Sequence, residues 1–468
     1  MWAVVAFGII CRLAQFLSNQ SFWGDEAYVV LNVRDKTPTE LVGSLTMKVR
    51  GLEVPPQSAG PLYLISLKYL SQTIGDNEYA YRLPALVMGC ALLPLLAWLG
   101  LRMLSPTAAL VVVAWAALCD RMIDSSALVK QYGGDMTVAV ALMLIATAEK
   151  ICPVRRLAVV SVLTAVLMWF SEPAVFVFAG IALALGAEVF RLRGRMRGAI
   201  AWTVVVAPAA LSFVILYSVS MRAQQSRELY DFWKDYFPDY HRPLSLPWWL
   251  LRSVYGLCDY AYRPMGAIFL LLAGLGIWKW SRDEKLSRVS VFVAPVLLTL
   301  VAAAAHAYPF GQTRVDFFLI PGILILAGAG LDSLGKPQWL WLAAAPMLAS
   351  GLWQAVYHLP FPRCTSHIRP AVEWVKEHRQ SDDAILLIGQ NSWLVFYTYW
   401  PDVEGDVRNV GDAQTAEVSG RFWCVCEFAP GEFNKKRRPV IDLVSLGARH
   451  WKDLDYMGRG GAAMLFER

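Results

Sequence analysis

Two adjacent carboxylates, Asp25 and Glu26, directly follow the first apolar segment, in the stretch SFWGDEAY. A carboxylate beside aromatic rings at a bilayer surface is poorly hydrated, which raises its pKa toward the range of a working general base. Such a base could take a proton from an attacking hydroxyl or amine. A solvated helix N-cap is the plainer interpretation, so the pair by itself does not establish a site.

The elements that must position this pair are membrane helices. Of the 468 residues, 56% are apolar and only 17% are charged, and a soluble chain with so few charges could not cover its surface. The 19 Trp and 18 Tyr suit membrane interfaces. The net charge of +6 includes no basic stripe among base-stacking aromatics, which argues against nucleic acid as a partner.

Stretches of roughly 20 apolar residues predict membrane spans. We predict eleven, near residues 1–18, 83–103, 105–120, 131–148, 156–171, 173–190, 199–219, 264–280, 288–306, 314–331 and 338–357. Lys and Arg cluster in the connections that a cytoplasmic N-terminus would place inside, such as Arg191, Arg193, Arg195 and Arg197. The expected topology therefore puts the N-terminus in the cytoplasm and the C-terminus outside.

Three polar pieces then share the external side of a plasma or inner membrane. Residues 1–357 form a membrane domain with external loops 19–82 and 220–263, the second rich in aromatics and Pro. Residues 358–468 are expected to form a small α/β domain, periplasmic or extracellular, with a helix in IRPAVEWVKEHRQ and strands in AILLIG, FWCVCEF and AAMLFE. Export would permit one disulfide, from Cys364 to Cys424 or Cys426.

Four stretches in this order resemble the bacterial members of glycosyltransferase family 39, in the GT-C superfamily. They are SFWGDEAY, VPPQSAGPLYLISLKYL with the later RLPALV, DSSALVKQYGGD, and HAYPFGQTRVDFFLIP. That superfamily includes the protein O-mannosyltransferases and the lipid A aminoarabinose transferase. The resemblance covers about residues 1–335. It implies a transferase with the GT-C architecture that moves a sugar from a polyprenyl-phosphate carrier to a lipid, glycan or protein acceptor outside the membrane.

The resemblance maps the family's catalytic carboxylate onto Asp25, and Glu26 matches the second letter of the pair. Displacing a lipid phosphate from a sugar C1 needs a base for the acceptor and cations for the departing phosphate. Lys130 and Arg314 lie at predicted external span ends, where a lipid phosphate would lie, and Arg suits forked contacts with phosphate oxygens. Snorkelling of long cationic side chains at helix ends is the alternative.

Further residues could contact the phosphate or support the site. Tyr132 could hydrogen-bond phosphate or belong to an aromatic belt, and His306 could assist the leaving group or be structural. Asp135, just inside the fourth span, could orient Lys130. Arg12 and Arg82 are expected to pair with first-loop carboxylates, and Arg82 could instead contact the donor phosphate. Tyr28 is expected to support the site. Glu172 is expected mainly to be a solvated turn residue.

The sequence departs from the family in one turn. The connection between spans three and four often carries an acidic residue before the basic one, but here it reads SSALVKQY, which puts a second carboxylate and any metal built on it in doubt. No His cluster, HExxH, GxGxxG or P-loop suggests a metal or a nucleotide-sugar donor. We therefore predict an inverting reaction without a metal or other cofactor.

Two other hypotheses keep the membrane fold. In a transporter or lipid flippase, charges at Arg12, Asp135 and Arg314 would line a path through the membrane. A non-catalytic scaffold would tolerate the loss of Asp25.

Overall fold

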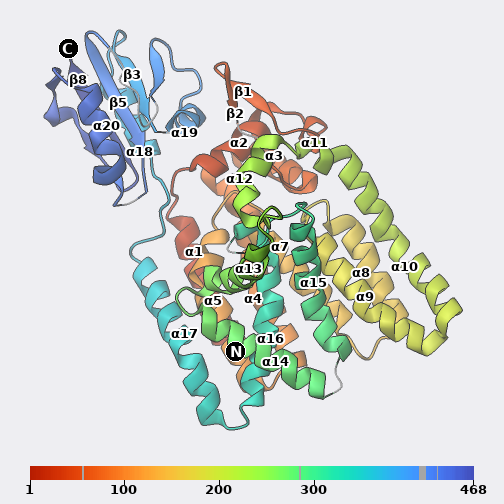
Figure 1. Ribbon diagram of the computed structural model, residues 1–468. Helices are drawn as coiled ribbons and strands as arrows, with labels where there is room; N and C mark the ends of the chain where they lie inside the picture. Colours follow the sequence, from red (N-terminus) through yellow and green to blue (C-terminus); the bar gives the residue numbers. More distant parts are fainter. Residues whose placement is uncertain (55–56, 284–285, 312, 390, 411–417, 430) are drawn as a thin grey trace.

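The computed structural model describes residues 1–54, 57–283, 286–311, 313–389, 391–410, 418–429 and 431–468. It is a bundle of apolar helices with a separate C-terminal sheet domain (Figure 1). Three motif residues of the sequence analysis, Pro55, Pro56 and Gln312, lie outside the described residues.

A helix lies at each of the eleven predicted spans. These helices are α1 (Trp2–Leu17), α4 (Glu78–Met103), α5 (Pro106–Leu118), α7 (Tyr132–Ala146), α8 (Pro153–Leu167), α9 (Ala174–Arg193), α10 (Arg195–Leu216), α14 (Gly266–Arg282), α15 (Leu286–Ala304), α16 (Ile320–Ser333) and α17 (Pro337–His358). Five helices among the described residues are long and apolar enough to cross a membrane, or up to six if a bent pair forms one span. The membrane location is therefore supported, and the number of crossings stays a prediction.

The bundle is held by close backbone contact and apolar packing. Gly276 of α14 and Gly330 of α16 face each other's helix backbones so closely that an added β-carbon would clash. Small residues are what let membrane helices approach in this way, since lipid gives no hydrophobic driving force for helix association. Around this contact, one apolar core runs through most of the bundle.

The predicted first external loop, residues 19–82, is folded at one end of the bundle. After α1 come α2 (Gly24–Asp35), the short turn η1 (Glu40–Val42), the hairpin of β1 (Met47–Val49) and β2 (Leu52–Val54), and α3 (Pro61–Ile74). Between α5 and α7 lies a short helix, α6 (Asp120–Ser125).

The predicted external loop 220–263 is largely helical. It holds η2 (Tyr217–Met221), α11 (Arg222–Gln224), α12 (Arg227–Trp233), η3 (Lys234–Tyr236), η4 (Pro243–Ser245) and α13 (Leu246–Tyr262). The segment Pro243–Tyr262 meets α14 at 112°, a geometry of a broken span or a re-entrant loop. Its Trp- and Leu-rich sequence contains no apolar stretch of span length, so hydropathy alone predicts a loop here.

The C-terminal domain is a sheet covered by helices, as predicted. Its strand order is β4-β3-β5-β8-β6, with β7 also paired to β8, and β3 runs parallel to both β4 and β5. The elements are α18 (Arg369–His378), β3 (Ala384–Ile388), α19 (Ser392–Tyr399), β4 (Val407–Val410), β5 (Arg421–Glu427), η6 (Phe433–Arg437), α20 (Arg438–Val444), β6 (Arg449–His450), η7 (Lys452–Leu454), β7 (Tyr456–Met457) and β8 (Gly461–Glu467).

The disulfide that export would permit in this domain is not formed. All eight cysteines are free. Cys424 and Cys426 alternate with residues of the other face along β5, so both side chains point into the same apolar core, where they are fully buried. Cys364 lies in the segment that connects α17 to α18, so it does not share that core.

Candidate active site

The candidate site lies where the first loop meets the start of α4, the turn before α7 and the turn before α16. Asp25 and Glu26 occupy the first turn of α2, where the unpaired amides of a helix N-terminus favour negative charge. Asp25 forms an ion pair with Arg314, the first residue of the turn η5 (Arg314–Leu319) that leads into α16. The Arg314 guanidinium also lies over the Trp23 ring, 5.3 Å from its centroid. Both charged side chains keep some exposure, so the pair can meet a ligand.

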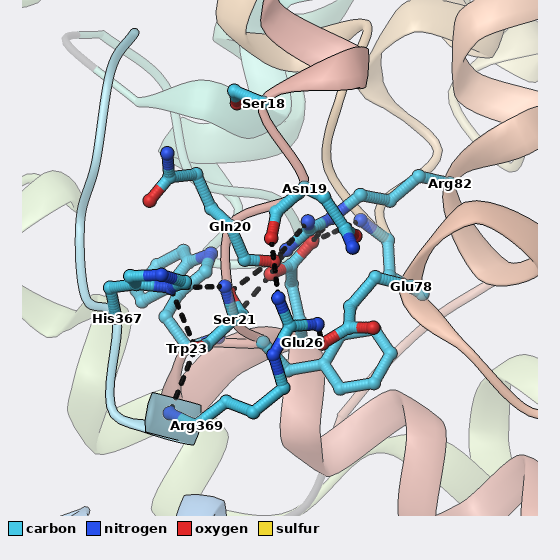
Figure 2. A network of polar contacts seen from close by, with 12 residues as sticks. Ser18, Asn19, Gln20, Ser21, Trp23, Glu26, Glu78, Arg82, His367 and Arg369 are labelled. Carbon is cyan, nitrogen blue, oxygen red and sulfur yellow. Dashed lines mark hydrogen bonds and ion pairs between the residues drawn. The ribbon is translucent and has the colours of Figure 1, made fainter. Parts of the chain in front are cut away.

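Glu26 has a different environment from its neighbour. Its side chain is fully buried and forms a forked ion pair with Arg82 of α4, at 2.9 Å from Nε and 2.6 Å from Nη2 (Figure 2). The Val129 amide donates a further hydrogen bond to Glu26 at 2.7 Å. Arg82 also donates to the carbonyls of Gln20 and Ser21. The pair therefore ties α2, α4 and the first loop together, and Arg82 has its donors engaged within the protein.

Lys130 lies in the turn before α7 and is 5% exposed. Its ammonium donates to the Gln57 side chain at 2.7 Å. Burial lowers the Lys130 pKa to about 8, with Asp25 opposing that shift and Arg314 adding to it. The charges of these three residues therefore interact, and Lys130 is still mostly protonated at neutral pH. Tyr132, two residues later, is buried within the electrostatic reach of Asp25 and Arg314.

His306 lies with the aromatic segment of the 220–263 region. Its ring nitrogens contact the Tyr230 hydroxyl at 2.9 Å and the Pro238 carbonyl at 3.0 Å. Its ring also stacks on Phe237, with 5.2 Å between centroids. These contacts make His306 an anchor for residues 230–240.

Two of the expected supporting contacts are wrong. Arg12 does not pair with a first-loop carboxylate: it is fully buried and donates to the carbonyls of Gly8, Ala116 and Ala117. The last two lie in the final turn of α5, where carbonyls have no partner within the helix. Asp135 does not hold Lys130, because the Lys130 ammonium donates to Gln57 and the Asp135 side chain lies against Ser171.

A cavity of about 480 Å³ lies beside the site. Its walls include Trp115, Arg121, Tyr236, Tyr260 and Arg363, so α6, α13 and the aromatic region all contribute. The Arg121 guanidinium lies 5.0 Å from the Tyr260 ring centroid. Arg314 is close enough to interact electrostatically with the same tyrosine. The cavity is thus adjacent to the Asp25–Arg314 pair.

The whole chain is similar in structure to ArnT from Cupriavidus metallidurans bound to undecaprenyl phosphate. The match has a TM-score of 0.52 and 12% sequence identity and covers 99% of this chain and 97% of that one. The apo state of the same protein matches with a TM-score of 0.50, 12% identity and the same coverage. The chain has the GT-C fold. The oligosaccharyltransferase of Archaeoglobus fulgidus also matches, with a TM-score of 0.47 and 9% identity over 98% of this chain and 72% of that one.

No family model and no curated protein matches the sequence. The GT-C fold is therefore established by structure alone, over the membrane bundle and the C-terminal domain together.

The C-terminal domain docks directly on the first loop, which the sequence did not reveal. His367 Nδ1 accepts a hydrogen bond from the Ser21 amide at 3.0 Å, and Arg369 forms an ion pair with Glu78 at 2.6 Å (Figure 2). Tyr28 donates to the Asn391 side chain at 3.1 Å, and Asn391 lies against Gly24. Tyr28 thus supports the loop that carries Asp25 through the C-terminal domain.

Glu427, at the end of β5, is a second carboxylate near Asp25 that sequence reasoning missed. Burial raises its pKa to about 7, and the Asp25 charge adds to this, while Ser366, Arg437 and the Gly24 amide oppose it. Nothing in FWCVCEF marks this residue, because the strand motif carries no information on where the domain docks. Among the described residues, no group of three or more His, Cys, Asp or Glu could hold a metal ion, and metal independence stays a prediction.

Proposed function

We propose that the protein transfers a sugar from a polyprenyl-phosphate carrier to an acceptor on the external side of the membrane. The observation that carries this proposal is the Asp25–Arg314 pair, with Lys130 close by, in a chain with the GT-C fold. The similar ArnT structure has undecaprenyl phosphate bound, which supports a carrier of this class.

In the proposed reaction, Asp25 accepts the proton of the acceptor hydroxyl or amine as that group forms a bond to the sugar C1. The bond from C1 to the phosphate oxygen breaks, and the polyprenyl phosphate leaves with the bonding electron pair. Arg314 and Lys130 stabilise the charge that develops on the phosphate, and preorganised cations in a partly buried site are effective for this. A single displacement of this kind inverts the configuration at C1.

The free protein holds Arg314 on Asp25, so the incoming phosphate competes with the carboxylate for the guanidinium. This releases Asp25 for its role as base once the donor is bound. The adjacent cavity, with Arg121 and Tyr260 on its wall, is where we place the acceptor.

The transporter hypothesis required Arg12, Asp135 and Arg314 to line one path. Arg12 is fully buried against the end of α5, with Nη1 and Nη2 of its guanidinium on backbone carbonyls. Arg314 pairs with Asp25. This arrangement favours a fixed site over a path.

The test is transfer of label from a panel of radiolabelled polyprenyl-phosphate sugars to cell-envelope lipids, glycans and proteins by the purified full chain. Asp25→Asn runs beside the wild type, and Asp332→Asn, which makes the same exchange at the other end of the bundle, is the matched control. Transfer that only Asp25→Asn abolishes supports the proposal. Transfer that survives Asp25→Asn removes this base, and no transfer from any donor to any acceptor overturns the function.

A further inference from the structure

The C-terminal domain reaches the first turn of α2, which carries Asp25, and the reaction described above does not use this contact. Asn391, just before α19, and Glu427, at the end of β5, both lie against Gly24, the first residue of α2. A β-carbon added to Gly24 would lie only 3.1 Å from the Asn391 side chain. Glycine at this position therefore lets the domain approach the end of the helix closely.

Glu427 supplies a hydrogen-bond acceptor that α2 itself lacks. The first amides of a helix have no acceptor within the helix. The Glu26 amide donates to the Trp23 carbonyl at 2.8 Å, but the Gly24 amide needs an acceptor from outside. The Glu427 carboxylate accepts this hydrogen bond. A carboxylate at a helix N-terminus also interacts favourably with the helix dipole. The contact fixes the residue directly before Asp25.

The position of Glu427 is in turn set by the sheet domain. Its amide donates to the Ser392 hydroxyl at 3.1 Å, and its carbonyl accepts from the Arg437 Nε at 3.0 Å. The Ser392 hydroxyl donates to the Ile388 carbonyl at the end of β3 at 2.7 Å. The Ser366 side chain lies against the Glu427 carboxyl group. Glu427 is thus held by β3, β5 and η6 together.

A support of this kind matters because the ion pair between Asp25 and Arg314 is not permanent in the proposed reaction. The donor phosphate draws Arg314 away, and Asp25 then lies on a terminal helical turn without its partner. Terminal turns fray readily. A misplacement of about 1 Å can lower the rate of an enzyme by about 100-fold. The base therefore needs a contact that does not involve the groups that bind phosphate.

We propose that Glu427 is a positioning residue for Asp25: it holds the Gly24 amide and so keeps the first turn of α2 in place while the donor phosphate occupies Arg314. This inference rests on the proposed function, because it takes Asp25 to be the base. It makes the C-terminal domain a part of the active site, as the element that maintains the position of the base during turnover.

This role has a pH signature. Burial and the Asp25 charge raise the Glu427 pKa to about 7, and the ionised form is the stronger acceptor for an amide. The value of kcat should therefore rise as the pH rises through 7. The charged and titratable groups that face Glu427 are Asp25 and Tyr28 of α2, Cys364 of the connecting segment, Arg437 of η6 and Cys426 of β5. Burial raises the pKa of Tyr28, Cys364 and Cys426, so these three stay neutral near pH 7.

The experiment measures kcat and donor KM of the purified full chain in detergent, with the polyprenyl-phosphate sugar and the acceptor that support transfer by the wild type. Glu427→Ala removes the acceptor for the Gly24 amide and should lower kcat by about 10–100-fold with an unchanged donor KM. Glu427→Gln keeps an oxygen there, so its kcat should match the wild type at pH 6 and lack the rise through pH 7. Glu377→Ala, at an exposed residue of α18, is the matched control, and melting temperatures verify folding.

Hydrogen exchange gives a second measurement that does not need the chemical step. With bare polyprenyl phosphate bound, the amides of residues 24–26 should stay protected in the wild type and in Glu427→Gln, and lose protection in Glu427→Ala. Without the carrier, Arg314 still holds Asp25, so the three proteins should differ less.

The outcomes separate the inference from the proposed function. A Glu427→Ala protein with wild-type kcat overturns the inference and leaves the proposed function intact. A Glu427→Gln protein that is as slow as Glu427→Ala at pH 6 also overturns it, because an oxygen acceptor would then not suffice. If the wild type transfers no sugar from any donor, the proposed function fails, and the inference fails with it.

Discussion

The carboxylate of Asp25 is paired with the guanidinium of Arg314, although the two residues are far apart in the sequence of the membrane domain. Arg314 also stacks on Trp23, two residues before Asp25. The ion pair fixes the first turn of α2 against the start of η5. In the proposed reaction, the two partners of this contact are the base and a group that binds the departing phosphate.

Arg314→Ala should weaken donor use by about 10–100-fold, because hydrogen bonds to charged groups are worth about 1.5–3 kcal/mol. Arg314→Lys should recover part of this loss, since an ammonium keeps the charge but cannot form the forked contact with two phosphate oxygens. The measurement is KM for the donor beside the melting temperature in detergent. An unchanged KM in Arg314→Ala would show that the phosphate binds elsewhere.

Donor use should fall above about pH 8 because Lys130 loses its proton there. Burial lowers the Lys130 pKa to about 8, and only the protonated form attracts phosphate. Binding supported by Lys130 is therefore present at pH 7 and lost as the pH rises through 8. In Lys130→Arg, the fall in donor use should shift to higher pH, since Arg stays charged. A pH profile of donor KM that is the same in both proteins would exclude Lys130 from the phosphate site.

Glu26→Gln should destabilise the fold where Asp25→Asn does not. Glu26 is fully buried on Arg82, and removal of one partner of a buried pair costs about 3–5 kcal/mol in unfolding free energy. The Asp25–Arg314 pair keeps some exposure, so the loss of its carboxylate charge should cost less than the loss of the fully buried Glu26 charge. Thermal unfolding of both variants measures the difference. The double variant Glu26→Gln/Arg82→Gln should be less destabilised than the sum of its single variants, and simple additivity would refute the coupling.

Hydropathy predicted the helices because every span-length apolar stretch must bury its backbone polar groups in a helix. Hydropathy could not show that Asp25 and Glu26 have different partners. Neighbouring helix residues point about 100° apart, so one carboxylate faces Arg314 and the other faces α4. That choice depends on contacts between distant segments. The error at Arg12 has the same origin, since carbonyls at the end of α5 are not visible in a charge pattern.

Docking of the C-terminal domain should weaken in acid through His367. Burial lowers the His367 pKa to about 4, with Arg369 and Arg82 adding to the shift and Glu78 opposing it. Its Nδ1 accepts from the Ser21 amide and so must be unprotonated in the docked state. The stability that His367 contributes is complete above its unfolded pKa of about 6.5 and falls as the pH drops toward 4. Hydrogen exchange of residues 19–28 at pH 7 and pH 5 measures this. His367→Asn should remove part of the pH dependence, and an identical dependence in the variant would contradict the role.

Glu427 should have the opposite effect on stability. Burial and the Asp25 charge raise its pKa to about 7, so the folded protein favours the protonated carboxyl. The contribution to stability is complete below the unfolded pKa of about 4.3 and is lost as the pH rises through 7. Glu427→Gln keeps the shape without the charge, so its melting temperature should exceed that of the wild type at pH 8 and approach it at pH 5. Glu432→Gln, an exchange in the same domain, is the control. A Glu427→Gln protein that melts below the wild type at pH 8 would show that the ionised carboxylate stabilises the interface.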